Sequence, residues 1–277
     1  MKIAVLSDVH GNLPALSAVL DDIEGWGADQ VILNGDLVNR GPCSLECLRL
    51  LQTRVPESRC IKGNHEAYVL ACAEDPLSPE DPTRELRLFA HWTYHQLGSA
   101  VADIAAWVEH YDLDAPAGAS LHITHGSRLG YRAGISASTS AEELAEKLGP
   151  PRDLFVGSHT HKPLIKRFNG TLVVNTGSVG QPLDGDERAA YGRFTLENGR
   201  WQAEIARVPF DKPRALQDMD ESGFLEHGGA VTRLIRLELE QARMHVGSWM
   251  REYLPRVKAG EISVAAGVES YLRSCEA

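Results

Sequence analysis

The strongest constraint on the fold is a series of short apolar runs, each followed by a polar turn rich in Asp, Asn and His. The first run, Lys2–Ser7, leads to Asp8 and His10. The same arrangement recurs four more times along the chain: Asp29–Leu33 leads to Asp36, Arg59–Lys62 to Asn64 and His65, Ser120–Thr124 to His125, and Asp153–Val156 to His159 and His161. Functional groups collect beyond the carboxyl ends of strands in open α/β sheets, so we expect these side chains to meet at one edge of a sheet.

The segments between these runs have a helical pattern. Leu13–Trp26 repeats apolar residues at helical spacing, Ser44–Thr53 predicts a second helix, and Thr83–Val108 predicts a long, largely helical stretch. Strands that alternate with helices predict an α/β fold with parallel neighbours and right-handed crossovers.

The pattern changes near Tyr191, after one more expected strand at Thr171–Val174. Arg193–Glu197 and Trp201–Val208 flank Asn198-Gly199, which predicts an antiparallel hairpin with a type I′ turn.

We therefore expect one domain over residues 1–210 and a helical C-terminal extension, residues 211–277, packed on the same domain. The amphipathic region Glu238–Arg256 suits packing on its own core, and a homodimer contact is the alternative. Glu238, Glu240 and Arg243 are expected on a solvated helical face.

Composition excludes several classes. A formal net charge of -10 argues against a nonspecific nucleic-acid binder, which needs Lys and Arg to displace counterions. No apolar run reaches the roughly 18 residues of a membrane span, and Asp8 and His10 interrupt any signal peptide. The five cysteines form no CxxC pair and are expected to be reduced thiols, which favours a cytoplasmic protein.

The residue types of the polar turns suit divalent metal ions. Imidazole nitrogens bind Mn, Fe, Zn, Ni or Co, the Asn64 amide adds a neutral oxygen, and the Asp36 carboxylate has two oxygens that can bridge two ions. Two ions about 3.5 Å apart bind phosphate oxygens and lower the pKa of a water molecule to generate hydroxide. Taken singly, each motif is equally an ordinary turn, since Gly and Asn tolerate left-handed backbone. Five such turns on successive strand ends favour the metal site.

The order SDVHGN, NGDLVNRGP, KGNHE, HITHG and VGSHTHKP resembles the calcineurin-like metallophosphoesterase superfamily. These motifs span residues 7–163, and NTGSVGQPLDGD with the hairpin after it resembles the compact bacterial and archaeal branch up to about residue 210. The resemblance implies a four-layer αββα sandwich, in which two mixed sheets are flanked by helices.

The resemblance also implies roles for single residues. Asp8, His10, Asp36 and His161 would hold the first metal, and Asp36, Asn64, His125 and His159 would hold the second. His65 would donate a proton to the leaving oxygen, and Arg40 would clamp the phosphate through its planar guanidinium. The alternatives are a turn-packing imidazole for His65 and a surface loop position for Arg40.

The chain departs from the expected motifs at three positions, two of them relative to the phosphoprotein phosphatases. Asn39 stands where those enzymes carry the Asp that orients the acid His, and Lys62 replaces the Arg before GNHE. Ser158 replaces the usual Gly before the first His of the last motif, which is tolerable if its backbone angles are ordinary. His122 lies too early to replace His125 and is expected to point from a strand.

The sequence thus predicts a metal-dependent hydrolase of phosphoric esters that uses two divalent ions, with Mn as the favoured metal, and acts on a small phosphodiester or nucleotide. One alternative is a phosphomonoesterase or protein phosphatase. The other is a non-catalytic scaffold with this fold, although scaffolds tend to lose ligands that are all present here.

Overall fold

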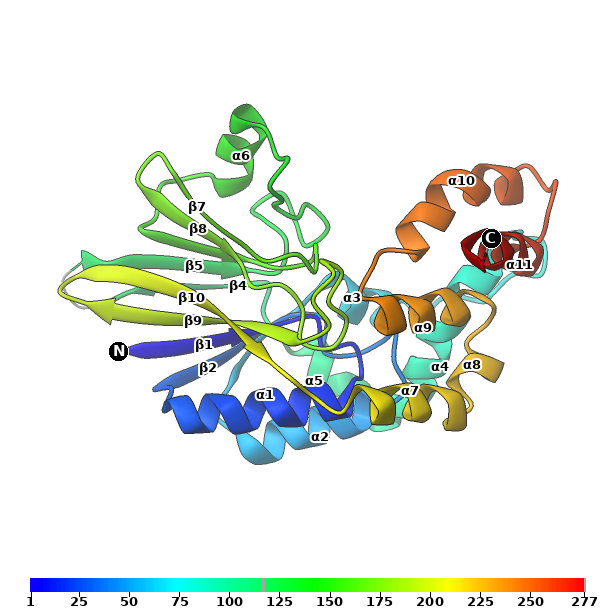
Figure 1. The fold of residues 1–277 in the computed structure, drawn as a ribbon, viewed down its shortest axis with the longest axis horizontal. Helices are drawn as coiled ribbons and strands as arrows, with labels where there is room; N and C mark the ends of the chain where they lie inside the picture. Colours follow the sequence, from blue (N-terminus) through cyan, green and yellow to red (C-terminus); the bar gives the residue numbers. More distant parts are fainter. Residues whose placement is uncertain (116–117, 277) are drawn as a thin grey trace.

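Two five-stranded sheets pack face to face at the centre of the protein (Figure 1). The computed structural model describes residues 1–115 and 118–276. The first sheet has the order β10-β9-β1-β2-β3 and the second the order β4-β5-β6-β8-β7. The strands are β1 (Lys2–Leu6), β2 (Gln30–Asn34), β3 (Arg59–Ile61), β4 (His110–Asp114), β5 (Ser120–Thr124), β6 (Leu154–Gly157), β7 (Leu164–Phe168), β8 (Thr171–Asn175), β9 (Ala189–Glu197) and β10 (Arg200–Val208).

Helices cover the outer faces of both sheets and continue to the C-terminus. They are α1 (Leu13–Trp26), α2 (Ser44–Arg54), α3 (Asn64–Ala71), α4 (Leu88–Leu97), α5 (Val101–Ala105), α6 (Ala141–Leu148), α7 (Lys212–Glu221), α8 (Phe224–His227), α9 (Val231–Gln241), α10 (Val246–Lys258) and α11 (Val264–Glu276), with 3-10 turns at Arg84–Arg87 and Gly98–Ala100.

The burial pattern confirms the predicted four-layer sandwich. Side chains such as Val5 and Ile32 of the first sheet pack against Ile123 and Val156 of the second. Alternate residues point the other way, so that Leu6 of β1 meets α1 and α2, whereas Phe155 of β6 meets α6. Figure 1 shows α1 and α2 beneath the first sheet and α6 above the second.

Helix α1 shows how local sequence fixes one of these layers. The Asn12 side chain accepts a hydrogen bond from the backbone N–H of Ala15 (3.1 Å) and so caps the helix, and Pro14 lies in the first turn. The helix ends at Gly27, which has a left-handed φ of 72°. The predicted bounds, Leu13–Trp26, are confirmed.

Parallel pairing in the middle of each sheet places the functional loops on one side. Strands β1, β2 and β3 run parallel, as do β5, β6 and β8, whereas β9, β10, β4 and β7 are antiparallel to their neighbours. The predicted hairpin is confirmed, with positive φ at both Asn198 and Gly199, as a type I′ turn requires.

The expected largely helical stretch over Thr83–Val108 is confirmed, and it consists of two 3-10 turns and two helices. Its chain is divided between α4 and α5 by Gly98, which has a φ of 52° and terminates α4. Strands β4 and β7 and helix α6 were not expected from the sequence, because β4 and β7 are edge strands whose side chains are mostly half-exposed or exposed.

The five helices α7–α11, called the C-terminal helices below, form a third apolar core. Phe224, Leu234 and Trp249 are fully buried there, and Phe89 of α4 joins them. The apolar faces of α9 and α10 are therefore packed within the chain, as the sequence favoured. No helix in the described residues is long and apolar enough to cross a membrane.

Candidate metal centre

The loops after β1, β2, β3, β5 and β6 bring the predicted ligand residues together at one edge of the two sheets. The backbone there is unusual. Asp8, His10, Asp36, His159 and His161 have φ values of 52°, 51°, 57°, 69° and 57°, a left-handed region that non-glycine residues rarely adopt. Such backbone persists only where the surroundings enforce it, and it is typical of functional sites.

Asp8, His10 and His161 form the first cluster of potential ligands. The Nε2 atom of His161 lies 3.2 Å from Oδ1 of Asp8 and 3.2 Å from Nε2 of His10. All three side chains are buried. Two nitrogens and a carboxylate oxygen therefore converge on one point.

Asp36, His125 and His159 form a second cluster beside the first, together with Asn64. The Nε2 atom of His125 lies 3.2 Å from Oδ2 of Asp36 and 3.1 Å from Oδ1 of Asn64, which is also 2.8 Å from Nδ1 of His159. Asp36 Oδ2 lies 3.9 Å from Nε2 of His10 as well. The Asp36 carboxylate thus adjoins both clusters.

The orientation of the imidazoles fits metal ions. Nδ1 of His125 donates to the backbone oxygen of Asn34 (2.8 Å), and Nδ1 of His161 donates to that of Gln181 (2.6 Å). In the neutral rings, both Nε2 lone pairs consequently face carboxylate oxygens. Oδ1 of Asp8 is buried and has no hydrogen-bond donor among the described residues. Acceptors that face acceptors in a dry site repel one another unless a cation lies between them, so the residues present fit divalent ions.

The pKa values of His125 and Asp36 also show that the site favours positive charge. Burial acts to lower the pKa of His125, but the carboxylates of Asp36 and Asp8 outweigh it and raise that pKa to about 10. Burial likewise acts to raise the pKa of Asp36, yet His125 and His65 hold it well below its usual range. Without a metal, a proton on His125 supplies the positive charge beside the carboxylates.

Two glycines allow the loops to approach so closely. A Cβ atom on Gly63 would lie 2.1 Å from Oδ1 of Asp36, and one on Gly35 would lie 2.6 Å from Nδ1 of His125. Gly35 also has a φ of 82°. Any larger residue at either position would displace a candidate ligand.

Glu66 is a site residue that the sequence reasoning missed. Its carboxylate accepts hydrogen bonds from the backbone N–H groups of Asp36 (2.8 Å), Leu37 (2.8 Å), Val38 (3.3 Å) and Gly63 (2.8 Å). It ties the Asp36 loop to the start of α3. Burial and the Asp36 charge raise its pKa to about 7, although the backbone hydrogen bonds oppose them. A Glu three residues after the cap of a helix is the capping-box pattern, and this signal could have identified it.

His65 is held as a neutral ring by Asn39. The amide oxygen of Asn39 accepts from the backbone N–H of Arg40 (3.0 Å) and from the Thr93 hydroxyl (3.3 Å), so its nitrogen is the atom that faces Nδ1 of His65 (3.0 Å). Nδ1 therefore accepts, and the proton lies on Nε2. Burial lowers the pKa of His65 to about 3, and Asp36 opposes this only in part. The resting ring is a neutral hydrogen-bond donor and not an imidazolium.

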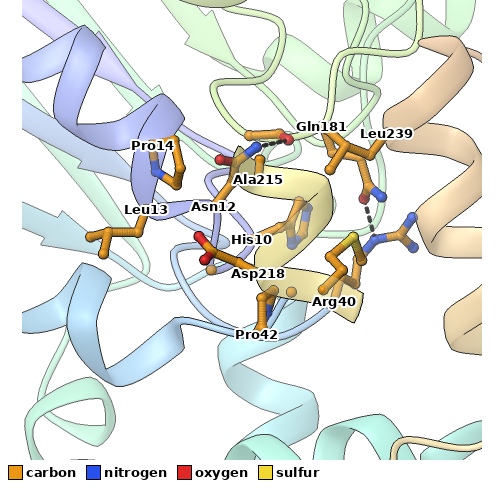
Figure 2. Close-up of a pocket in the computed structure, with 14 residues that line it drawn as sticks. His10, Asn12, Leu13, Pro14, Arg40, Pro42, Gln181, Ala215, Asp218 and Leu239 are labelled. Carbon is orange, nitrogen blue, oxygen red and sulfur yellow. Dashed lines mark hydrogen bonds between the residues drawn. The ribbon is translucent and has the colours of Figure 1, made fainter. Parts of the chain in front are cut away.

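Arg40 is tied to the C-terminal helices. Its Nε donates to Oε1 of Gln181 (2.7 Å), as Figure 2 shows, and one terminal nitrogen pairs with the buried carboxylate of Glu238 on α9. A small cavity of about 20 Å³ lies beside these groups, between His10 and Leu239. The expected solvated position of Glu238 is wrong: the residue is 1% exposed, because it pairs with an arginine that lies far away in the sequence.

The departures from the phosphatase pattern have local explanations. Ser158 has no positive φ, and its buried hydroxyl accepts from the Asn34 amide (2.8 Å), so serine is accommodated. Nζ of Lys62 donates to the backbone oxygen of Ala105 (3.3 Å). His122 lies on β5 as expected and pairs with Asp112 (2.9 Å).

A cleft of about 550 Å³ opens above the two clusters. Candidate ligands and His65 lie on one side, and the C-terminal helices contribute the other side. It is lined by Asp36, Arg40, Asn64, His65, Ser136, His159, Thr160, His161, Lys162, Leu183, Glu238, Met244, Val246, Gly247 and Met250. Its size suits a small molecule.

An αββα sandwich that gathers buried carboxylates and imidazoles at the floor of an open cleft defines a metal-dependent hydrolase. The chain belongs to the calcineurin-like phosphoesterase superfamily, because the model of that domain matches residues 1–199. It is accordingly a metallophosphoesterase, a member of a family that uses divalent metals.

Similar proteins cover different shares of the chain. A metallophosphoesterase of known structure from Sphaerobacter thermophilus is 26% identical, has a TM-score of 0.68, and aligns with 87% of this chain and 99% of its own. Phosphodiesterase YfcE of Escherichia coli is 25% identical over 198 residues, 69% of this chain and 86% of YfcE. A symmetrical bis(5'-nucleosyl)-tetraphosphatase of Ectopseudomonas mendocina is 39% identical over 89 residues, but these cover only 31% of this chain and 33% of that protein.

Proposed function

We propose that the protein hydrolyses phosphodiesters with the help of two divalent ions. Asp8, His10, Asp36 and His161 would hold one ion, and Asp36, Asn64, His125 and His159 the other. The observation that carries this proposal is the position of the Asp36 carboxylate, which adjoins both clusters of buried acceptors. When bound, such ions supply an activated water and neutralise the charge of the phosphoryl oxygens.

The side chains around the clusters would bind and orient the ester. Arg40 is 13% exposed on its side-chain surface and lines the cleft, and in the described chain its Nη1 donors have no protein partner. These donors would bind phosphate oxygens. His65 also lines the cleft, and its Nε2–H would donate to the leaving oxygen as negative charge develops there. The sequence predicted proton transfer from His65 to that oxygen, whereas a neutral ring would stabilise the oxygen through a hydrogen bond.

The relatives support a phosphodiester or a nucleotide as the substrate. YfcE is named as a phosphodiesterase, and the partial match from Ectopseudomonas mendocina is named as a symmetrical bis(5'-nucleosyl)-tetraphosphatase. The open cleft has room for a second group on phosphorus in addition to the leaving group.

Four further predictions from the sequence belong to this proposal. Mn²⁺ is the favoured ion, because the ligands combine imidazoles with hard oxygens. A cytoplasmic location agrees with the five free cysteines. The division into a domain over residues 1–210 and an extension over residues 211–277 agrees with the gap between β10, which ends at Val208, and α7, which begins at Lys212. The fourth prediction is that the chain forms a homodimer.

Removal of one charge at the junction of the clusters tests the proposal. Asp36→Asn should lose both metal content, measured by elemental analysis after Mn²⁺ loading, and turnover of bis(p-nitrophenyl) phosphate. Asp114→Asn, whose side chain is 82% exposed on β4, removes the same charge away from the site and should change neither. Retained turnover of the Asp36 variant with Mn²⁺ would contradict the shared-ligand assignment.

A further inference from the structure

The C-terminal helices form one wall of the cleft. Met244 and Met250, beside α10 and on it, line the cleft and are 39% and 43% exposed. They are two of the few large apolar side chains in the described chain that remain exposed. Thioether side chains are flexible and polarisable, and they adapt to flat apolar or aromatic groups. In Figure 1 these helices (yellow to red) stand beside the loops at the functional edge of the sheets.

Glu238 connects this wall to the phosphate-binding side of the cleft. One of its oxygens accepts from the backbone N–H groups of His245 (2.7 Å) and Val246 (2.8 Å), which fixes the start of α10. The other oxygen pairs with Arg40. Gln181, the second partner of Arg40, also donates to the backbone oxygen of Ile235 on α9 (3.1 Å). The same helix therefore positions both Arg40 and the methionines.

The ion pair changes the charge that a substrate meets. Arg40 and Glu238 together carry no net charge, and Glu238 is 1% exposed, so solvent screens its carboxylate poorly. Apart from the imidazoles, the other basic side chain among the lining residues is Lys162. The Arg40 guanidinium can thus donate hydrogen bonds to a phosphoryl group, while its pairing with Glu238 removes the attraction for a second negative charge on that group.

We propose that the C-terminal helices select a phosphodiester monoanion over a phosphomonoester dianion, with Glu238 as the positioning residue that neutralises Arg40 and with the second ester group lying against Met244 and Met250. This inference rests on the proposed function, since it assigns specificity to the same site. It names the substrate class as a diester that carries an apolar or aromatic group opposite its leaving group.

Three substrates with one leaving group test the proposal: p-nitrophenyl phosphate, methyl p-nitrophenyl phosphate and phenyl p-nitrophenyl phosphate, assayed with Mn²⁺ at pH 8. We expect the wild-type protein to prefer the diesters. Glu238→Gln should raise kcat/KM for the monoester relative to the methyl diester by about tenfold, because the repulsive charge is gone. Glu240→Gln removes the same charge from the same helix, where that side chain is 50% exposed and pairs with Arg236, and should leave the ratio unchanged.

The apolar wall is tested separately. The double variant Met244→Ala, Met250→Ala should lower kcat/KM for the phenyl diester about tenfold relative to the methyl diester, a difference of about 1.4 kcal/mol. Leu129→Ala, at a side chain 59% exposed that does not line the cleft, is the matched control.

The outcomes separate the two levels of the proposal. A wild-type protein that binds Mn²⁺ but hydrolyses none of the three esters would refute the proposed function itself. Unchanged ratios in a folded Glu238→Gln protein would overturn the charge argument and leave the hydrolase intact. If circular dichroism shows that this variant does not fold, the double methionine variant tests the inference instead. An equal loss of kcat/KM for the phenyl and the methyl diester would then overturn it.

Discussion

Gly63→Ala is the perturbation that most sharply tests whether close packing positions the metal ligands. Gly63 has a φ of -101°, which any residue can adopt, so the added methyl group acts through its contacts alone. That methyl would lie 2.1 Å from Oδ1 and 2.7 Å from the backbone nitrogen of Asp36. To restore an ordinary contact of 3.4 Å, the carboxylate must move by about 1.3 Å.

The expected cost follows from this displacement. Overpacking of a buried site destabilises a protein by about 1–3 kcal/mol, and metal sites tolerate ligand shifts of only about 0.2 Å. Urea unfolding of the metal-free protein should therefore show a loss of about 1–3 kcal/mol. Titration calorimetry should show weakened Mn²⁺ binding, and kcat for bis(p-nitrophenyl) phosphate should fall about 100-fold or more.

A second glycine provides the control. Gly25 lies in α1, and a Cβ atom there would meet nothing within 4 Å. Gly25→Ala should stabilise the protein by about 0.5–1 kcal/mol through helix propensity and should leave metal binding unchanged. If Gly63→Ala instead keeps wild-type metal affinity and activity to within a factor of about two, the packing argument is wrong.

Four other predictions concern three single side chains. His125 has a pKa of about 10 in the metal-free protein and is protonated at pH 7, so metal binding should release a proton, seen as a buffer-dependent calorimetric enthalpy; no release would contradict the assigned charge. Because that pKa is raised from 6.5, its stabilising contribution is present below pH 6.5, and the metal-free protein should lose stability as the pH rises through about 10. His65→Ala should retain metal but slow esters with poor leaving groups far more than nitrophenyl esters, and an equal loss on both would exclude the donor role. Ser158→Gly should cost about 1–3 kcal/mol in urea unfolding, since the buried Asn34 amide loses an acceptor, and should keep metal content; loss of metal would show that the hydroxyl also positions the ligands.

Local signals explain why much of the site could be predicted from the sequence. Each candidate ligand follows an apolar strand by one to a few residues, and parallel strands end at the same edge of a sheet. Asp8 and His161 are far apart in the chain, yet the pattern places both at strand ends. Helix α1 was predicted to the residue because its cap, proline and terminal glycine all lie within its own segment.

Long-range pairing explains what the sequence could not provide. Glu238 lies between other charged residues at helical spacing, which is typical of a solvated face. Its carboxylate is buried because it accepts from the backbone N–H groups of His245 and Val246 and forms an ion pair with Arg40. The sequence separates these partners by 198 positions. The edge strands β4 and β7 were missed because each has only five residues and their side chains are half-exposed or exposed.

The central claim is that one carboxylate, Asp36, joins two metal ions on this chain. Elemental analysis together with electron paramagnetic resonance of the Mn²⁺-loaded protein tests it most directly, because two ions that share a ligand are magnetically coupled, whereas isolated ions are not. We expect two ions per chain with a coupled spectrum, and loss of both in Asp36→Asn. One ion per chain, or two uncoupled ions that persist in the variant, would contradict the claim.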